Sequence, residues 1–75
     1  RITVETRAKT DANISSREKE VLNWMKEGKT NWEISVILTI SERTVKFHVQ
    51  NIERKLNAVN KAHAIAIAMD TGLVL

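Results

Sequence analysis

The sequence has no cysteine and no proline, and only two of its 75 residues are glycine. Without cysteine it can form neither a disulfide framework nor a thiolate-ligated metal site, which is compatible with a reducing cytoplasm. So few helix breakers favour an all-α fold over a turn-rich β fold. The longest apolar stretch, around residues 64–69, falls far short of the ~20 residues that span a bilayer. We therefore expect one small helical domain without a membrane partner.

The chain also lacks the residue patterns of an enzyme site. His48 and His63 are isolated and do not stand at metal-ligand spacing with carboxylates. Neither a glycine-rich phosphate loop nor a nucleophile elbow is present. Trp24 is interpreted as a core residue, and Trp32 as packing against the preceding helix. We expect no catalytic activity, no metal and no cofactor.

Positive charge is in excess and unevenly distributed. Twelve basic residues against nine acidic ones give a net charge of +3. Residues 41–61 alone carry a net charge of +3, whereas residues 1–40 carry +1 and residues 62–75 carry −1. A basic segment of this kind is typical of a surface that attracts a polyanion such as DNA.

Helix start and stop signals organise most of the chain. Ser15 with Glu18, and Thr30 with Glu33, form capping boxes, and Gly28 is suited to end the first helix. Four helices are expected, at about residues 16–27, 31–39, 42–56 and 61–71.

The first residues of the chain differ from the rest. Residues 1–13 are polar and show no helical period, so we interpret them as a linker. Residues 14–75 are then a single domain with one small core.

The second and third expected helices have the spacing of a helix-turn-helix. The second is about two turns long, and Ile34, Ile37 and Leu38 recur on one side of it. After a turn of about three residues, Ser41 caps a longer helix. A short helix, a tight turn and a longer helix are typical of the motif that places its second helix in the DNA major groove.

The third helix separates into two faces at 100° per residue. Val45, Val49, Ile52 and Leu56 fall together and are expected in the core. Lysine and glutamine on the other face suit base edges, and an outward phenylalanine suits a thymine methyl group. The other reading is a solvated charged face with one stray aromatic residue. The outward face carries Arg43, Lys46, Phe47, Gln50 and Arg54.

Phosphate contacts are expected at the edges of this surface. A helix N-terminus offers free N–H groups to an anion, and hydroxyl, imidazole and cationic side chains can bind phosphates beside the groove. For Lys29 the other reading is ordinary solvation, and for Thr30 it is capping alone. The expected phosphate contacts are Lys29, Thr30, Asn31, Arg43, Thr44, His48, Arg54 and Lys55.

Four segments in order resemble the LuxR-type helix-turn-helix family. They are Ile14–Leu22, Glu27–Ile34, Ile40–Val49 and Arg54–Asn57. The resemblance covers residues from Ile14 to about Met69, which is most of the chain. One departure is the isoleucine at position 14, where the family commonly has leucine.

The resemblance implies a four-helix domain that binds an inverted repeat as a homodimer. It implies base reading by Lys46 and Gln50 with Phe47 between them. It also implies phosphate contacts by five of the residues above: Lys29, Thr30, Thr44, His48 and Arg54. The last helix is the usual dimer contact of the family, which fits a segment that is apolar nearly all round. The expected dimer residues are Ala62, Ile65, Ala66 and Met69.

Two segments, Lys29–Ile34 and Asn60–Ile65, resemble the quorum-sensing branch of the family. Members of that branch carry an N-terminal acyl-homoserine-lactone domain, so a signal ligand is expected to bind there and not to this chain. The expected location is cytoplasmic, at the nucleoid.

Two alternatives remain open. The domain could be the output half of a two-component response regulator with a receiver domain. It could instead be a helical protein-interaction module whose last helix binds a partner helix or RNA polymerase. The interaction-module interpretation is disfavoured by the outward strip of Lys46, Phe47 and Gln50. A protein-interaction module would not need a basic, groove-facing strip on the second helix of a helix-turn-helix.

Overall fold

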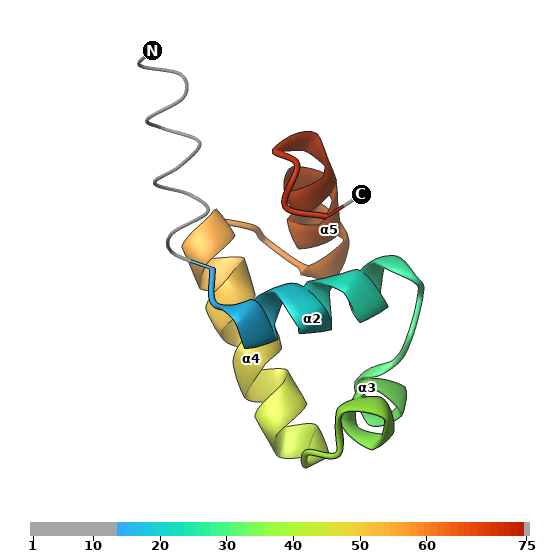
Figure 1. Ribbon diagram of the computed structural model, residues 1–75. Helices are drawn as coiled ribbons and strands as arrows, with labels where there is room; N and C mark the ends of the chain where they lie inside the picture. The colour runs from blue at the N-terminus through green and yellow to red at the C-terminus, as the bar shows by residue number, and fades with distance from the viewer. Residues whose placement is uncertain (1–13, 75) are drawn as a thin grey trace.

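The computed structural model describes residues 14–74, and this part of the chain contains four helices and no strand (Figure 1). The all-α prediction is confirmed, and the predicted helix bounds are right to within one residue. The linker predicted for residues 1–13 lies outside the described residues, as does Leu75. The helices are α2 (Ser16–Lys26), α3 (Asn31–Leu38), α4 (Glu42–Leu56) and α5 (Lys61–Asp70).

Each helix begins at a side chain that accepts a hydrogen bond from the first turn. The predicted capping boxes form at Ser15 and Thr30, where the cap hydroxyl and the carboxylate three residues later satisfy each other's backbone N–H groups. Ser41 and Asn60 cap α4 and α5 in the same sense, without the reciprocal bond. Loss of one N-cap side chain typically destabilises a helix by about 1 kcal/mol. Because each cap lies within three residues of its partner, the helix starts are determined by local sequence.

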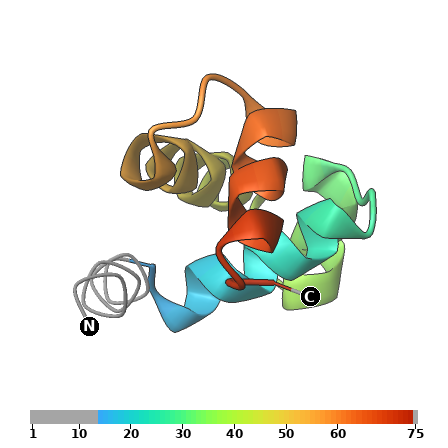
Figure 2. The ribbon, with the colours of Figure 1, turned by 90° about the horizontal axis from the view of Figure 1, so that it is seen from above.

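Helix α4 is the centre of the domain, and α2, α3 and α5 all pack against it. Figure 1 shows α2 crossing α4 and α3 lying at the N-terminal end of α4, and Figure 2 shows α5 over α2. The face of α4 predicted to be apolar is buried as expected. The buried core residues are Ile14, Val21, Leu22, Met25, Ile34, Val45, Val49, Ile52, Leu56, Ala64, Ala68 and Val74.

The apolar side of α3 is only partly buried. Ile34 is fully buried, but Ile37 is 42% exposed and the small polar Ser35 is buried instead. The hydroxyl of Ser35 donates to the carbonyl of Trp32 at 2.6 Å, which satisfies its polar group inside the fold. A helix of two turns does not show from its sequence alone which edge of its apolar side meets the core.

The turn between α3 and α4 contains an unexpected conformation. Thr39 has φ 58° and ψ 47°, the left-handed region that favours glycine, and the N–H of Ile40 donates to the carbonyl of Ser35 at 3.0 Å. A β-branched residue is strained there because its Cβ lies close to the following carbonyl. Asn57 adopts the same conformation after α4, where an asparagine tolerates it more readily than a β-branched residue does.

Replacing Thr39 by glycine should therefore stabilise the domain. Removing the Cβ relieves strain of roughly 1–2 kcal/mol, while the extra freedom of glycine in the unfolded chain takes back about half of it. The expected gain is about 0.5–1 kcal/mol, measured by urea unfolding with circular dichroism. Thr39→Ala keeps the Cβ and should gain less; an equal gain from both variants would show that the conformation is not the cause.

Candidate DNA-binding interface

The outward face of α4 is built as the helical period predicts. Lys46, Phe47 and Gln50 are exposed, while Val45 and Val49 on the opposite face are buried in the core. Because the inward side chains anchor α4 in the core, the outward ones stand on a fixed scaffold. The positions are confirmed; the base-reading roles stay predictions.

Phe47 is the conspicuous member of this face. Its side chain is 59% exposed, although burying a phenylalanine is worth about 1.5–3 kcal/mol. Its ring centroid lies 5.9 Å from that of His48, with the two ring planes tilted by 58°. The ring therefore has an aromatic neighbour but leaves most of its apolar surface exposed to solvent.

His48 lies between the outward face and the core, and its two ring nitrogens differ. Nδ1 is buried and has no hydrogen-bond partner. A buried N–H without an acceptor is rarer than a buried lone pair, so we assign the proton of the neutral ring to Nε2. That nitrogen is then the one that can donate to a phosphate.

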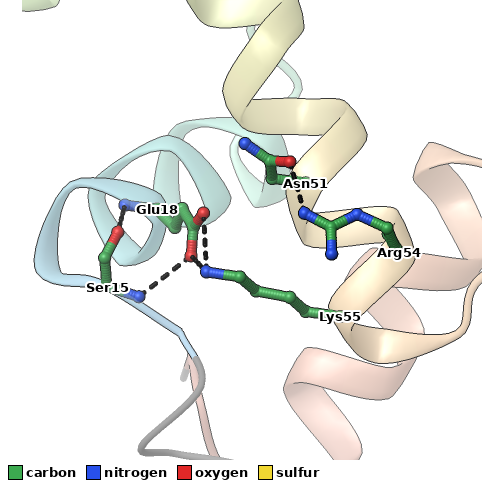
Figure 3. Close-up of polar contacts among 5 residues, drawn as sticks. All are labelled: Ser15, Glu18, Asn51, Arg54 and Lys55. Carbon is green, nitrogen blue, oxygen red and sulfur yellow. Dashed lines mark hydrogen bonds and ion pairs between the residues drawn. The ribbon is translucent and has the colours of Figure 1, made fainter.

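Arg43 and Arg54 place two guanidinium groups on α4. Arg43 is exposed in the first turn. The guanidinium Nη2 of Arg54 donates to the side-chain oxygen of Asn51 at 2.7 Å (Figure 3). Since a guanidinium has five N–H groups, this bond orients Arg54 and leaves donors for a phosphate.

The N-terminal end of α3 is a polar cluster with both charge signs. Thr30 accepts from the N–H of Glu33 at 3.1 Å, and its own N–H donates to the Glu33 carboxylate at 2.8 Å. The backbone bond from Thr30 lowers the pKa of Glu33; slight desolvation opposes this, and the charge of Lys29 adds to it. Glu33 is therefore ionised at neutral pH and competes with a phosphate for this helix end.

Thr44 was expected to bind a phosphate through its hydroxyl. It also takes part in the cap of α4 formed by Ser41. Its hydroxyl lies 2.8 Å from that of Ser41, and its N–H donates to the same oxygen at 3.0 Å. A loss of DNA binding in a Thr44 variant would therefore mix a phosphate contact with the cap of α4.

Lys55 has a partner that the sequence analysis did not find. Its ammonium donates to both carboxylate oxygens of Glu18, at 2.9 and 3.1 Å (Figure 3). The Glu18 side chain is 5% exposed and also accepts from the N–H of Ser15. Burial raises the pKa of Glu18, but the bond from Ser15 and the ammonium of Lys55 more than offset this and lower it.

The phosphate contact predicted for Lys55 stays a prediction. The ion pair with Glu18 favours a structural role for Lys55 instead. An ammonium that holds two oxygens of a buried carboxylate links α4 to the start of α2. Lys55 is thus committed to the fold that positions α4.

The four residues expected at a dimer contact lie on the outer side of α5. Ala64 and Ala68 are buried against the core, whereas Ala62, Ala66 and Met69 are exposed. Ile65 is half-buried. The stripe is available to a second copy, and its role stays a prediction.

Other surface features escaped the sequence analysis. Trp32 is 61% exposed and Val36 58%, so most of each side chain faces solvent, and the packing of Trp32 against the preceding helix stays a prediction. Trp24, interpreted as a core residue, is half-buried and packs against the core without being one of its buried residues. The interhelical partners of Glu18 and Lys61 were missed because they lie 37 and 30 residues away.

Between residues 14 and 74, no group of three or more histidine or acidic side chains is arranged to hold a metal ion. In the same range no helix is long and apolar enough to cross a membrane.

Two helices joined by a three-residue turn, with a basic, partly apolar face on the second helix, define a helix-turn-helix domain. Residues 12–68 match the model of the family described as bacterial regulatory proteins, luxR family. The chain belongs to this family.

Regulators of the family from several bacteria are similar to this chain. The regulatory protein SdiA of Escherichia coli is 52% identical over 64 residues, which are 85% of this chain and 27% of SdiA. The transcriptional activator LuxR of Aliivibrio fischeri is 49% identical over 69 residues, 92% of this chain and 28% of LuxR. The chain spans about a quarter of the length of these relatives.

Two solved structures share the fold. The crystal structure of Escherichia coli SdiA matches with a TM-score of 0.79 and 54% identity, over 84% of this chain and 26% of that one. The response regulator ChrA of a heme-sensing two-component system matches with the same TM-score and 38% identity, over 81% of this chain and 30% of ChrA. The fold is therefore shared with SdiA and with a response regulator of a two-component system.

Proposed function

We propose that this chain is the sequence-specific, double-stranded-DNA-binding output domain of a bacterial quorum-sensing transcription regulator. The observation that carries the proposal is the outward face of α4, where Lys46, Phe47 and Gln50 stand exposed on the second helix of a helix-turn-helix. Identities near 50% to regulators that include a quorum sensing-dependent one, RpaR of Rhodopseudomonas palustris, support the branch. The family is one of regulators, which is not an enzymatic class.

The proposed mechanism separates positioning from reading. Lys46 and Gln50 donate to base edges in the major groove, and Phe47 contacts the groove floor. Contacts to phosphates fix the register without selecting a sequence. Two copies paired through α5 place their α4 helices in successive major grooves, about one helical turn apart. The phosphate contacts are those expected above, with Lys55 reassigned to the fold.

In a longer parent protein, a signal domain would control whether two such domains pair on DNA. The signal ligand would bind that domain. We propose a cytoplasmic location at the nucleoid, and RNA polymerase as the protein that such a regulator contacts.

Selection from a pool of random duplexes tests the proposed function. The domain should enrich an inverted repeat whose half-sites lie about 10 base pairs apart, centre to centre. Enrichment of no sequence, with retention of DNA that depends on salt alone, would reduce the function to non-specific binding.

A charge placed on the outer side of α5 should separate folding from dimerisation. Ala66→Glu puts a carboxylate on an exposed site, so its free energy of unfolding should stay within about 0.5 kcal/mol of wild type. Two carboxylates facing each other across the pair should abolish joint occupancy of the two half-sites. Gel-shift titration would show single-site complexes only; unchanged joint occupancy would place the dimer contact elsewhere.

The second candidate is an output domain with a receiver-linked parent. The match to ChrA at a TM-score of 0.79 favours it, while the lower identity to ChrA, 38% against 54% to the quorum sensing-dependent RpaR, argues for the quorum-sensing branch. The DNA-binding surface is the same in both cases.

A further inference from the structure

A hydrogen bond joins α5 to the N-terminal end of α3. The ammonium of Lys61, the first residue of α5, donates to the side-chain oxygen of Asn31 at 3.1 Å, at a partly buried position. Helices α3 and α5 each pack on α2 and α4. The bond therefore ties the helix proposed to form the dimer contact to the helix end proposed to bind a phosphate.

This bond also fixes the orientation of the Asn31 amide. An ammonium only donates, so it is the oxygen of the amide, and not its nitrogen, that faces Lys61. The oxygen and nitrogen lie at opposite ends of a planar amide. Lys61 therefore uses only the oxygen of the amide, and the side-chain N–H groups keep their capacity to donate to another acceptor.

Asn31 stands where such donors are useful to an anion. It is the first residue of α3, next to the cap Thr30, and the backbone N–H groups of the first turn have no acceptor inside the helix. The ionised Glu33 weakens this helix end as an anion site. Lys61 adds a positive charge near this helix end and orients the Asn31 amide as a further donor, and both offset the negative charge of Glu33.

We propose that Lys61 is a positioning residue for DNA binding, which holds the Asn31 amide with its N–H groups toward a backbone phosphate. The inference rests on the proposed DNA binding and deepens it. Lys61 acts through Asn31, so its contribution depends on the Asn31 side chain. A lysine that touched the phosphate itself would contribute whether or not Asn31 were present.

A double-mutant cycle separates these two roles. The probe is a fluorescein-labelled duplex carrying the inverted repeat that the wild-type domain selects, titrated by anisotropy at fixed salt. Lys61→Met keeps the aliphatic stem and removes the donor, and Asn31→Ala removes the amide. Each single variant should bind about five- to tenfold more weakly, within the range expected for loss of one ordinary hydrogen bond. In the Asn31→Ala background, Lys61→Met should cost less than about twofold.

Controls keep a structural or general charge effect apart from the proposed one. Lys19→Met, on α2 and outside every proposed contact, removes the same charge and should cost less than about twofold. Lys61→Arg keeps a donor and should restore most of the binding. The side-chain amide resonances of Asn31 in the DNA-free domain should shift in Lys61→Met while the thermal midpoint stays close to wild type.

Three outcomes would overturn the inference. Equal losses from Lys61→Met in both backgrounds would show that Lys61 contacts DNA directly or acts only through its charge. Wild-type affinity in Lys61→Met would show that the bond has no role in binding. If the wild-type domain bound no duplex, the proposed function would fail and this role with it; in the first two outcomes DNA binding itself stands.

Discussion

Lys55→Met should destabilise the domain by about 2–3 kcal/mol at pH 7, the largest effect expected for a single substitution outside the apolar core. The variant keeps the aliphatic stem and leaves the Glu18 carboxylate, 5% exposed, without its cation. Breaking a buried pair in this way typically costs about 3–5 kcal/mol. We place the cost lower because the Lys55 side chain is 28% exposed, so water reaches part of the pair.

The destabilisation caused by Lys55→Met should be largest at neutral pH and should decrease in acid. The pKa of Glu18 in the fold lies below its ordinary value of 4.5. A lowered folded pKa contributes stability that is present above the unfolded pKa and is lost as the pH falls through the folded one. The unfolded pKa of Glu18 is the same in both proteins and cancels, and loss of the Lys55 ammonium leaves the folded pKa of Glu18 higher in Lys55→Met than in wild type. The stability difference between the two proteins should therefore shrink as the pH falls from the folded pKa of the variant to the lowered folded pKa of wild type.

Urea unfolding at pH 7 and at a series of acidic pH values measures both statements. Lys19→Met serves as the matched control, since it removes one lysine from a partly exposed site on α2 without leaving a buried carboxylate. A destabilisation in Lys55→Met no greater than in Lys19→Met would show that the pair contributes nothing. If Lys55→Met were as stable as wild type but bound DNA with a weaker dependence on salt, Lys55 would be assigned to a phosphate contact.

Lys46→Ala should remove about 1–3 kcal/mol of the preference for the selected inverted repeat over a scrambled duplex. The side chain is exposed, so the fold should not change. In the proposed role its ammonium donates to acceptors on base edges, which differ between sequences, so its loss should weaken the specific complex more than the non-specific one. Anisotropy titrations of both duplexes in the same buffer give the two affinities.

Lys29→Ala is the companion variant, because Lys29 is proposed to contact a phosphate. It should weaken both duplexes alike and reduce the slope of log affinity against log salt by about 1. An equal weakening of both duplexes by Lys46→Ala would assign Lys46 to the backbone, and base reading would have to come from other residues.

The sequence predicted the parts of this domain that are encoded within one helical turn. Capping residues fixed the helix starts to within one residue, and the 3.6-residue period separated the buried Val45 and Val49 from the exposed Lys46 and Gln50. Those signals are local, so they survive in a single sequence. The outward face of α4 was therefore identified before its surroundings were known.

Features that depend on the packing of separate helices were not predicted. The capping box identified Glu18 as a helix start, but nothing local shows that Lys55 reaches it. The exposure of Ile37 follows from how α3 sits on α4, and the left-handed Thr39 follows from the tightness of the turn between them. The bond from Lys61 to Asn31 likewise exists only once α3 and α5 are in place.

The central claim is that the outward face of α4 is the surface that meets DNA. Amide and side-chain NMR shifts of the ¹⁵N-labelled domain, followed during titration with the selected duplex, test it most directly. The account predicts the largest changes at Phe47, Gln50 and the N-terminal end of α3, with further changes along α5 as two copies pair. Binding that leaves the resonances of Lys46, Phe47 and Gln50 unmoved would contradict it.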